Sequence, residues 1–98
     1  MKSLPKSGNF AHSNQIQQKK LVKYYNRAGV KQADEGKLME ALNYFNKALR
    51  IDPSSKQALF NRATIKVDLG EYEEARKDFS LIFDLNVSID QNGSSVFL

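Results

Sequence analysis

The chain has 98 residues, of which 41% are hydrophobic and 27% charged, with a formal net charge of +4 and no cysteine. This length fits one small domain built around a single core. The lack of cysteine excludes disulfides and thiolate metal sites.

Charge is distributed unevenly along the chain. Residues 1–33 contain seven lysines or arginines and no acid, whereas residues 34–98 contain eight bases and eleven acids. A basic N-terminal third would attract an acidic peptide or a phosphate backbone. The simpler interpretation is that its lysines form the solvated face of a helix.

Targeting signals are missing from the N-terminal residues. Residues 1–10 are polar and contain both proline and glycine, so they lack the apolar core of a signal peptide. No stretch is long enough to span a membrane as a helix. We therefore expect a cytoplasmic protein that does not engage membranes.

The first predicted elements are a flexible basic arm and a long helix. The arm covers residues 1–12 and includes the only histidine, His12, which has no ligand partner nearby. Ser13 or Asn14 caps the helix, which continues to about Glu35. Gly29 interrupts it at a cost of about 1 kcal/mol relative to alanine, and close approach of a neighbouring helix would compensate for that cost.

The second predicted helix lies between Gly36 and Pro53. Its apolar residues recur at spacings of three and four, which is typical of one face of an amphipathic helix. They are Leu38, Ala41, Leu42, Phe45, Ala48, Leu49 and Ile51. Because proline restricts the residue before it, the helix should end near Ile51 or Asp52.

Two further helices complete the predicted fold. Ser54 and Ser55 supply a turn and a cap, a third helix follows from Lys56 to Leu69, and Gly70 separates it from a fourth between Tyr72 and about Asn86. The connections are short, so neighbouring helices must pack antiparallel. The predicted fold is all-α, with four antiparallel helices of which the first is the longest.

The second pair of helices repeats the first. Six matched positions are 34 residues apart: Gly36 and Gly70, Leu38 and Tyr72, Ala41 and Ala75, Phe45 and Phe79, Leu49 and Phe83, Ile51 and Leu85. With Gly29 matched by Ala63 and a proline at position 53, this pattern resembles the tetratricopeptide repeat. We place a repeat domain at residues 13–86, with repeat 1 at about 22–55 and repeat 2 at about 56–87. Repeat 2 departs from the pattern at Ile82 and Val87.

The resemblance implies two helix-turn-helix units of an α-solenoid, whose first helices line a concave face that binds a protein or peptide. It implies no cofactor and no catalysis, and the sequence contains no glycine-rich phosphate loop or catalytic cluster. The expected groove residues are Lys23, Asn26, Arg27, Val30, Phe60, Asn61 and Thr64. Amides would hold the backbone of a peptide there, and Lys23 and Arg27 would meet an acidic terminus.

Two alternative functions stay open. Phe60-Asn61-Arg62-Ala63 resembles the middle repeat of co-chaperones that clamp the acidic tails of chaperones, but here the basic pair of Lys23 and Arg27 precedes it instead of following it. Packing within the stack is the competing interpretation of Asn61 and Arg62. Nucleic-acid binding through the basic third would use Tyr24 for stacking, and we do not favour it.

The C-terminal end raises a separate question. Ile82, Phe83 and Leu85 have only the tail of residues 87–98 to cover them, and this tail resembles the start of an unfinished third repeat. Three arrangements are open: the tail folds back, a second copy docks to give a homodimer, or the chain is a fragment of a longer array. We favour the fragment, with dimerisation through the exposed face as a consequence.

Overall fold

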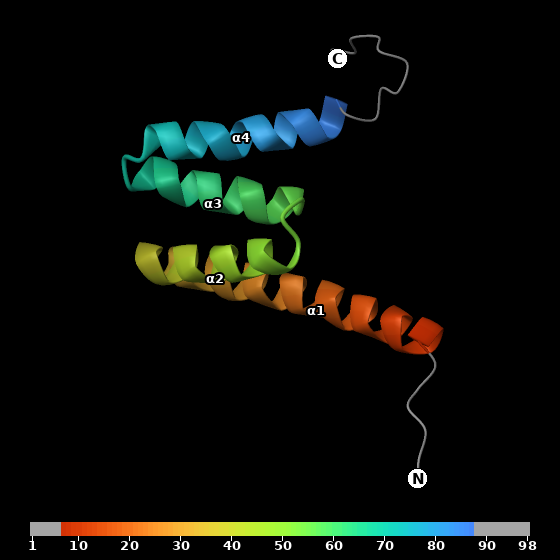
Figure 1. Ribbon diagram of the computed structural model, residues 1–98. Coiled ribbons are helices and arrows are strands. Elements are labelled where there is room, and N and C mark those ends of the chain that lie inside the picture. Colours follow the sequence, from red (N-terminus) through yellow and green to blue (C-terminus); the bar gives the residue numbers. More distant parts are fainter. Residues whose placement is uncertain (1–6, 88–98) are drawn as a thin grey trace.

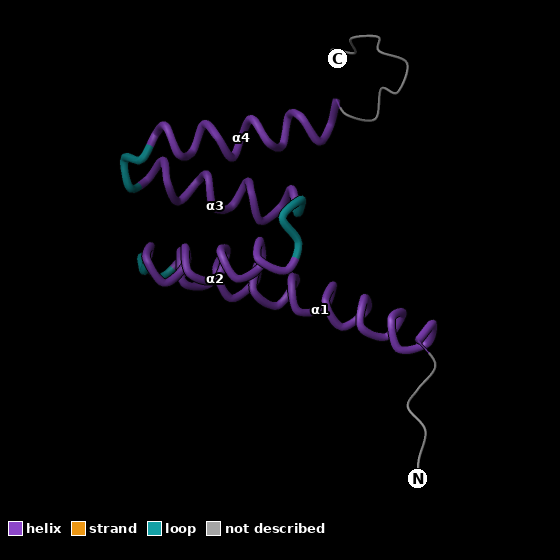
Figure 2. Tube along the Cα trace, in the orientation of Figure 1, coloured by secondary structure: helices purple, strands orange, loops and turns teal. Residues whose placement is uncertain are grey.

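The computed structural model describes residues 7–87 and contains four helices in this range. They are α1 (Ser7–Asp34), α2 (Leu38–Ile51), α3 (Lys56–Asp68) and α4 (Tyr72–Val87). Consecutive helices pack against each other, and α1 also contacts α3. Figure 1 shows the two helical hairpins stacked one on the other, and Figure 2 shows how short the connections are. The predicted all-α fold is confirmed.

Glycine ends the first helix of each hairpin. Gly36 and Gly70 have φ angles of +79° and +82°, in the left-handed region that is costly for residues with a side chain. The amide after each glycine donates to a carbonyl five residues back, from Lys37 to Gln32 at 2.9 Å and from Glu71 to Lys66 at 2.7 Å. Both ends are therefore Schellman motifs, which satisfy carbonyls that the helix leaves without partners.

The turn between α2 and α3 is fixed by polar side chains. Asp52 Oδ1 accepts hydrogen bonds from the Ser54 amide at 3.1 Å and from the Ser54 hydroxyl at 2.9 Å. Ser55 is the N-cap of α3, and its hydroxyl accepts from the Ala58 amide at 3.2 Å. The predicted cap and the predicted end of α2 are both confirmed.

The first helix starts earlier than the sequence indicated. It begins at Ser7, not at Ser13 or Asn14, so residues 7–12 of the expected arm are helical. No proline follows Pro5 in this stretch, and Gly8 alone is too weak a signal to prevent a helix. The N-terminal half of α1 consequently extends past the end of α2 (Figure 1).

Two clusters of buried apolar residues join the hairpins. One contains Ala48, Leu49, Ala58 and Leu59 at the junction of α2 and α3. The other contains Ala41, Phe45 and Ile65. The stripe predicted for α2 supplies four of these buried residues, as the spacing indicated.

Close contact between α1 and α2 explains the glycine within α1. A Cβ atom built on Gly29 would lie 2.7 Å from Cζ and 2.8 Å from Cδ1 of Phe45. Real Cβ atoms essentially never make contacts that short, so glycine is the residue that lets the Phe45 ring reach the α1 backbone. The close helix approach predicted from Gly29 is confirmed, and its partner is the second helix of the same hairpin.

A polar network joins three helices. Asp78 on α4 is only 2% exposed and accepts two hydrogen bonds from Arg62 on α3, from Nη2 at 2.7 Å and from Nε at 2.8 Å. The third nitrogen of Arg62, Nη1, donates to Asn46 Oδ1 on α2 at 3.0 Å. Lys66 Nζ lies 3.5 Å from Asp78. The hydrogen bonds to Asp78 raise the pKa of the Arg62 guanidinium above its ordinary value.

The last helix is covered only on one side by the residues that the structure describes. Ile82 and Leu85 pack against the cluster around Leu59. Phe83 is 51% exposed and Leu81 47% exposed. Ile82 and Leu85, for which the sequence offered only the tail as cover, are therefore in contact with the core between the hairpins. The tail from residue 88 lies outside the described range.

Candidate functional site

The seven predicted groove residues come from the first helix of each hairpin. Four lie on α1 and three on α3, two helices that contact each other. They differ in exposure: Asn26 is buried, Asn61 is half-buried, and Lys23, Arg27, Val30, Phe60 and Thr64 are exposed. The surface thus combines exposed cations and apolar side chains with more deeply placed amides.

Two of these amides have atoms without hydrogen-bond partners. Asn26 is 4% exposed, and its Oδ1 accepts no hydrogen bond. Asn61 Nδ2 is likewise buried and donates none. Leaving a buried polar atom without a partner costs about 1–3 kcal/mol. One atom is an acceptor and the other a donor, so each lacks a partner of the opposite kind.

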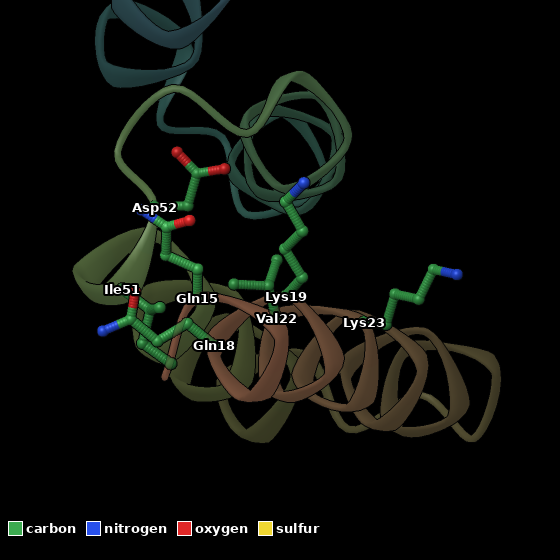
Figure 3. A pocket seen from close by; sticks show the side chains of 7 residues that line it. All are labelled: Gln15, Gln18, Lys19, Val22, Lys23, Ile51 and Asp52. Carbon is green, nitrogen blue, oxygen red and sulfur yellow. The ribbon is translucent and has the colours of Figure 1, made fainter. Parts of the chain in front are cut away.

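The two predicted cations lie on α1. Lys23 and Arg27 are one helical turn apart on α1 and exposed. Among residues 14–86, neither forms an ion pair. Lys23 also lines a cavity of about 590 Å³ below the turn that joins α2 to α3 (Figure 3). Both side chains are therefore available to an anionic group of a ligand.

Apolar side chains continue the surface across α3. Phe60 is 56% exposed and meets Phe79 of α4 edge to face, with the ring centroids 6.0 Å apart. Thr64 on the next turn donates its hydroxyl proton to the Phe60 carbonyl at 2.9 Å. Its hydroxyl oxygen can still accept a hydrogen bond. Val30 on α1 is 40% exposed.

Sequence reasoning missed Phe79 as a surface residue. Phe79 matches Phe45, 34 residues earlier, but it is 39% exposed and Phe45 only 1%. Sequence reasoning also missed the cavity at Lys23. The α1 residues that line it lie between Gln15 and Lys23, within the predicted first helix, but no sequence pattern indicated that this part of the helix would lie beside the end of α2.

Arg62 holds helices together and is not available to bind a ligand. The motif that resembles a chaperone clamp includes it, but its guanidinium is held by Asp78 and Asn46. Tyr25 is likewise engaged in packing, with Tyr44 at 6.2 Å between ring centroids and Lys47 Nζ 5.7 Å from its ring. Tyr24, which is 58% exposed, is the tyrosine on α1 that faces solvent.

The described residues offer no metal-binding cluster. Between residues 14 and 86 there is no group of three or more histidine, cysteine, aspartate or glutamate side chains placed to hold a metal ion. Nor does any helix in that range have the length and hydropathy needed to cross a membrane. What the exposed face of α1 and α3 provides is hydrogen bonding, positive charge and apolar contact.

Comparison with known proteins identifies the family. The chain matches the tetratricopeptide-repeat family over residues 32–81, about half of its length. The chain belongs to the tetratricopeptide-repeat family. It is also 43% identical over 60 residues to an uncharacterised protein of Methanocaldococcus jannaschii, a match that covers 61% of this chain and 70% of that protein. No solved structure matches it.

Membership of this family supports a general role in protein–protein interaction, since tetratricopeptide repeats are typically non-enzymatic scaffolds. It agrees with the architecture, in which each hairpin buries one face against its neighbour and leaves the other open. The surfaces that stacking leaves open are therefore the ones to consider for contact with other proteins.

Proposed function

We propose that this tetratricopeptide-repeat protein is a non-enzymatic scaffold that binds an extended peptide segment of a partner protein along α1 and α3. The observation that carries the proposal is the pair of buried, unpartnered amide atoms, Asn26 Oδ1 and Asn61 Nδ2. Rotation of the two side chains toward the surface would let the main chain of a peptide donate its N–H to the first atom and accept from the second with its carbonyl. Main-chain recognition of this kind gives affinity, and the flanking side chains give specificity.

The remaining predicted residues would contact the side chains of the peptide. Lys23 and Arg27 would bind carboxylates through charge-assisted hydrogen bonds. Val30 and Phe60 would contact apolar groups, since both expose large apolar surface. We assign Thr64 a lesser role, because its hydroxyl proton is already donated to its own helix.

The test is a comparison of captured partners. The full chain is immobilised beside a variant with Lys23, Arg27 and Asn61 changed to alanine, and proteins retained from an extract of the source cell are quantified by mass spectrometry. A control with Arg50→Ala, an exposed cation on α2 outside the groove, shows the effect of lost charge alone. We expect the triple variant to lose partners that the control keeps. Equal recovery by all three proteins would mean that the groove assignment is wrong.

A second candidate is self-association through α4. Tyr72, Phe79, Leu81 and Phe83 are between 39% and 68% exposed on this helix, and exposed apolar surface of this extent often marks an interface. Sedimentation velocity at micromolar concentration tests this idea, with Leu81→Ser as the matched variant. A species twice the monomer mass that disappears in the variant supports a homodimer, and a monomer at every concentration rules it out.

A further inference from the structure

The cavity shown in Figure 3 exists because α1 is longer than the repeat requires. The overhanging half of α1 passes below the turn between α2 and α3, and the space between them measures about 590 Å³. Repeat 1 begins at about residue 22, so the wall that α1 supplies lies mostly outside the repeat. The groove proposed above reaches this cavity at Lys23, which belongs to both.

Hydrogen-bond donors line the wall of the cavity that α1 supplies. Lys19 and Lys23 contribute two ammonium groups, and Gln15 and Gln18 contribute two amides. All four side chains are exposed, so their donor groups can form hydrogen bonds with a ligand. Four donors of this kind around one space favour a ligand that is rich in oxygen acceptors and negatively charged.

The rest of the lining is apolar, with one carboxylate. Val22 and Ile51 are both half-buried, and Val22 also packs against the core. Asp52 borders the same space, but its Oδ1 accepts two hydrogen bonds from Ser54. The apolar part is suited to an aliphatic side chain. None of the lining residues is aromatic, so the cavity lacks the stacking surface that a nucleobase would use.

The cations continue in a row along α1. Lys19, Lys23 and Arg27 are four residues apart in turn, which places them about 6 Å apart along the helix axis. No carboxylate among residues 14–86 forms an ion pair with any of them. In an extended peptide, side chains on one face repeat every second residue, about 6.6 Å apart. Carboxylates at alternate positions of an extended peptide therefore match the row.

We propose that the groove continues past Lys23 into this cavity, and that the ligand is an extended peptide with carboxylates at alternate positions and an aliphatic residue at the next position on the same face. The carboxylates pair with Arg27, Lys23 and Lys19, and the aliphatic side chain lies against Val22 and Ile51. The inference rests on the proposed function and specifies its partner. The acidic groups it requires are side chains, so a free C-terminal carboxylate is not needed.

Fluorescence anisotropy with a defined probe tests the proposal. The probe is a fluorescein-labelled, C-terminally amidated peptide, Glu-Ser-Glu-Ser-Glu-Ser-Leu, and the protein is the full chain. Lys19→Ala should weaken binding by about fivefold, as expected for the loss of one charge-assisted hydrogen bond. The matched control is Lys20→Ala, which removes the same charge from the neighbouring residue, outside the cavity lining. It should weaken binding by less than about twofold.

Further changes test the two ends of the ligand. Asp52→Asn keeps an oxygen that can accept from Ser54 and removes a negative charge, so it should strengthen binding by about twofold. A probe with serine in place of the leucine should bind about fivefold more weakly, because the buried aliphatic group is lost. A probe that ends in a free carboxylate should bind about as well as the amidated one.

Several outcomes would overturn the proposal. Equal losses of affinity in the Lys19 and Lys20 variants would mean that the peptide is attracted to the positive charge of the whole helix and not to the cavity. Equal affinity for the leucine and serine probes would mean that the cavity does not bind the aliphatic side chain. Tighter binding of a single-stranded oligo-uridylate than of the peptide at physiological salt would assign the cations to nucleic acid.

Asn61→Ala separates this inference from the function on which it rests. If Asn61→Ala weakens binding and Lys19→Ala does not, the peptide binds in the groove but does not reach the cavity. If Lys19→Ala weakens binding and Asn61→Ala does not, the peptide binds at the cavity and the groove assignment is wrong.

Discussion

The two hairpins of this protein share a backbone arrangement but hold their helices together by different means. In repeat 1, a glycine on α1 lets an aromatic ring on α2 reach the helix backbone, through the contact between Gly29 and Phe45. In repeat 2, alanine occupies the place of the glycine, and a bidentate ion pair between Arg62 and Asp78 joins α3 to α4. The 34-residue period thus specifies the path of the chain and leaves the chemistry of each helix contact free to vary.

The comparison also shows what a neighbouring hairpin contributes. Phe45 and Leu49 on α2 are 1% and 8% exposed, whereas their counterparts on α4, Phe79 and Phe83, are 39% and 51% exposed. α3 packs against α2, and no described helix packs on the corresponding face of α4. Burial at these positions is therefore decided by the next hairpin along the stack, and not by the residue type.

Matched substitutions at the two aromatic positions should give the largest difference. Phe45→Ala should lower the free energy of unfolding by about 3–5 kcal/mol, because it leaves a cavity in the core. Phe79→Ala should lower it by no more than about 2 kcal/mol, since part of that ring is already in contact with water. Urea denaturation followed by circular dichroism measures both values. Similar losses in the two variants would mean that the exposed ring is covered in solution.

Removing the charged contact of repeat 2 should have the next largest effect. Arg62→Ala leaves Asp78, only 2% exposed, with Lys66 as its remaining ion-pair partner, and should cost about 2–4 kcal/mol of unfolding free energy. Arg76→Ala is the control, because it breaks an exposed ion pair with Glu73 on the same helix. Denaturation curves for the two variants give the comparison, and equal midpoints would contradict the structural role assigned to Arg62.

The close contact of repeat 1 predicts a coupled effect. Gly29→Ala should destabilise by about 1–3 kcal/mol, because its Cβ cannot fit beside the ring of Phe45. In a Phe45→Leu background the smaller side chain makes room, and the same change should be neutral or stabilising, since alanine favours a helix. A double-mutant cycle measures this coupling. Additive losses would show that steric overlap is not the cause.

The smallest predicted effect concerns exposed ion pairs at the surface. Lys31 lowers the pKa of Glu35, to which it donates a hydrogen bond, below its ordinary value of 4.5. A carboxyl whose pKa is lower in the folded state stabilises the fold above its unfolded pKa, and this contribution is lost as the pH falls through the folded pKa. Lys31→Ala should raise the pKa of Glu35 in a carbon-detected NMR titration. An unchanged titration would mean that the pair is not formed in solution.

Local signals in the sequence predicted most of the fold. Glycine, proline and serine mark the ends of α2, α3 and α4, and the apolar spacing identifies the buried face of α2, because these features depend on residues close together in the chain. The close contact at Gly29 was predictable on a different ground, from a glycine inside a helix and its small counterpart, Ala63, 34 residues later.

Features that depend on how helices pack were not predictable. The pairing of Arg62 with Asp78 requires the rotation of α3 relative to α4, which no local pattern encodes. The exposure of Phe79 depends on which elements pack on the outer face of α4, and the cavity depends on how far α1 extends before the repeat begins. Asn26 and Asn61 were predicted as groove residues from the family pattern, but the unpartnered atoms that now support a binding role came from the structure.

The guanidinium of Arg62 has a consequence for how such chains can be rebuilt. It contacts Asp78 within its own repeat and Asn46 in the repeat before it, so the cut between repeats at residues 55 and 56 separates two partners of one network. A hybrid that joins repeat 2 to an unrelated preceding hairpin must import Asn46 or provide another acceptor at that position. The polar network of this protein therefore crosses the boundary between repeats that the sequence period suggests.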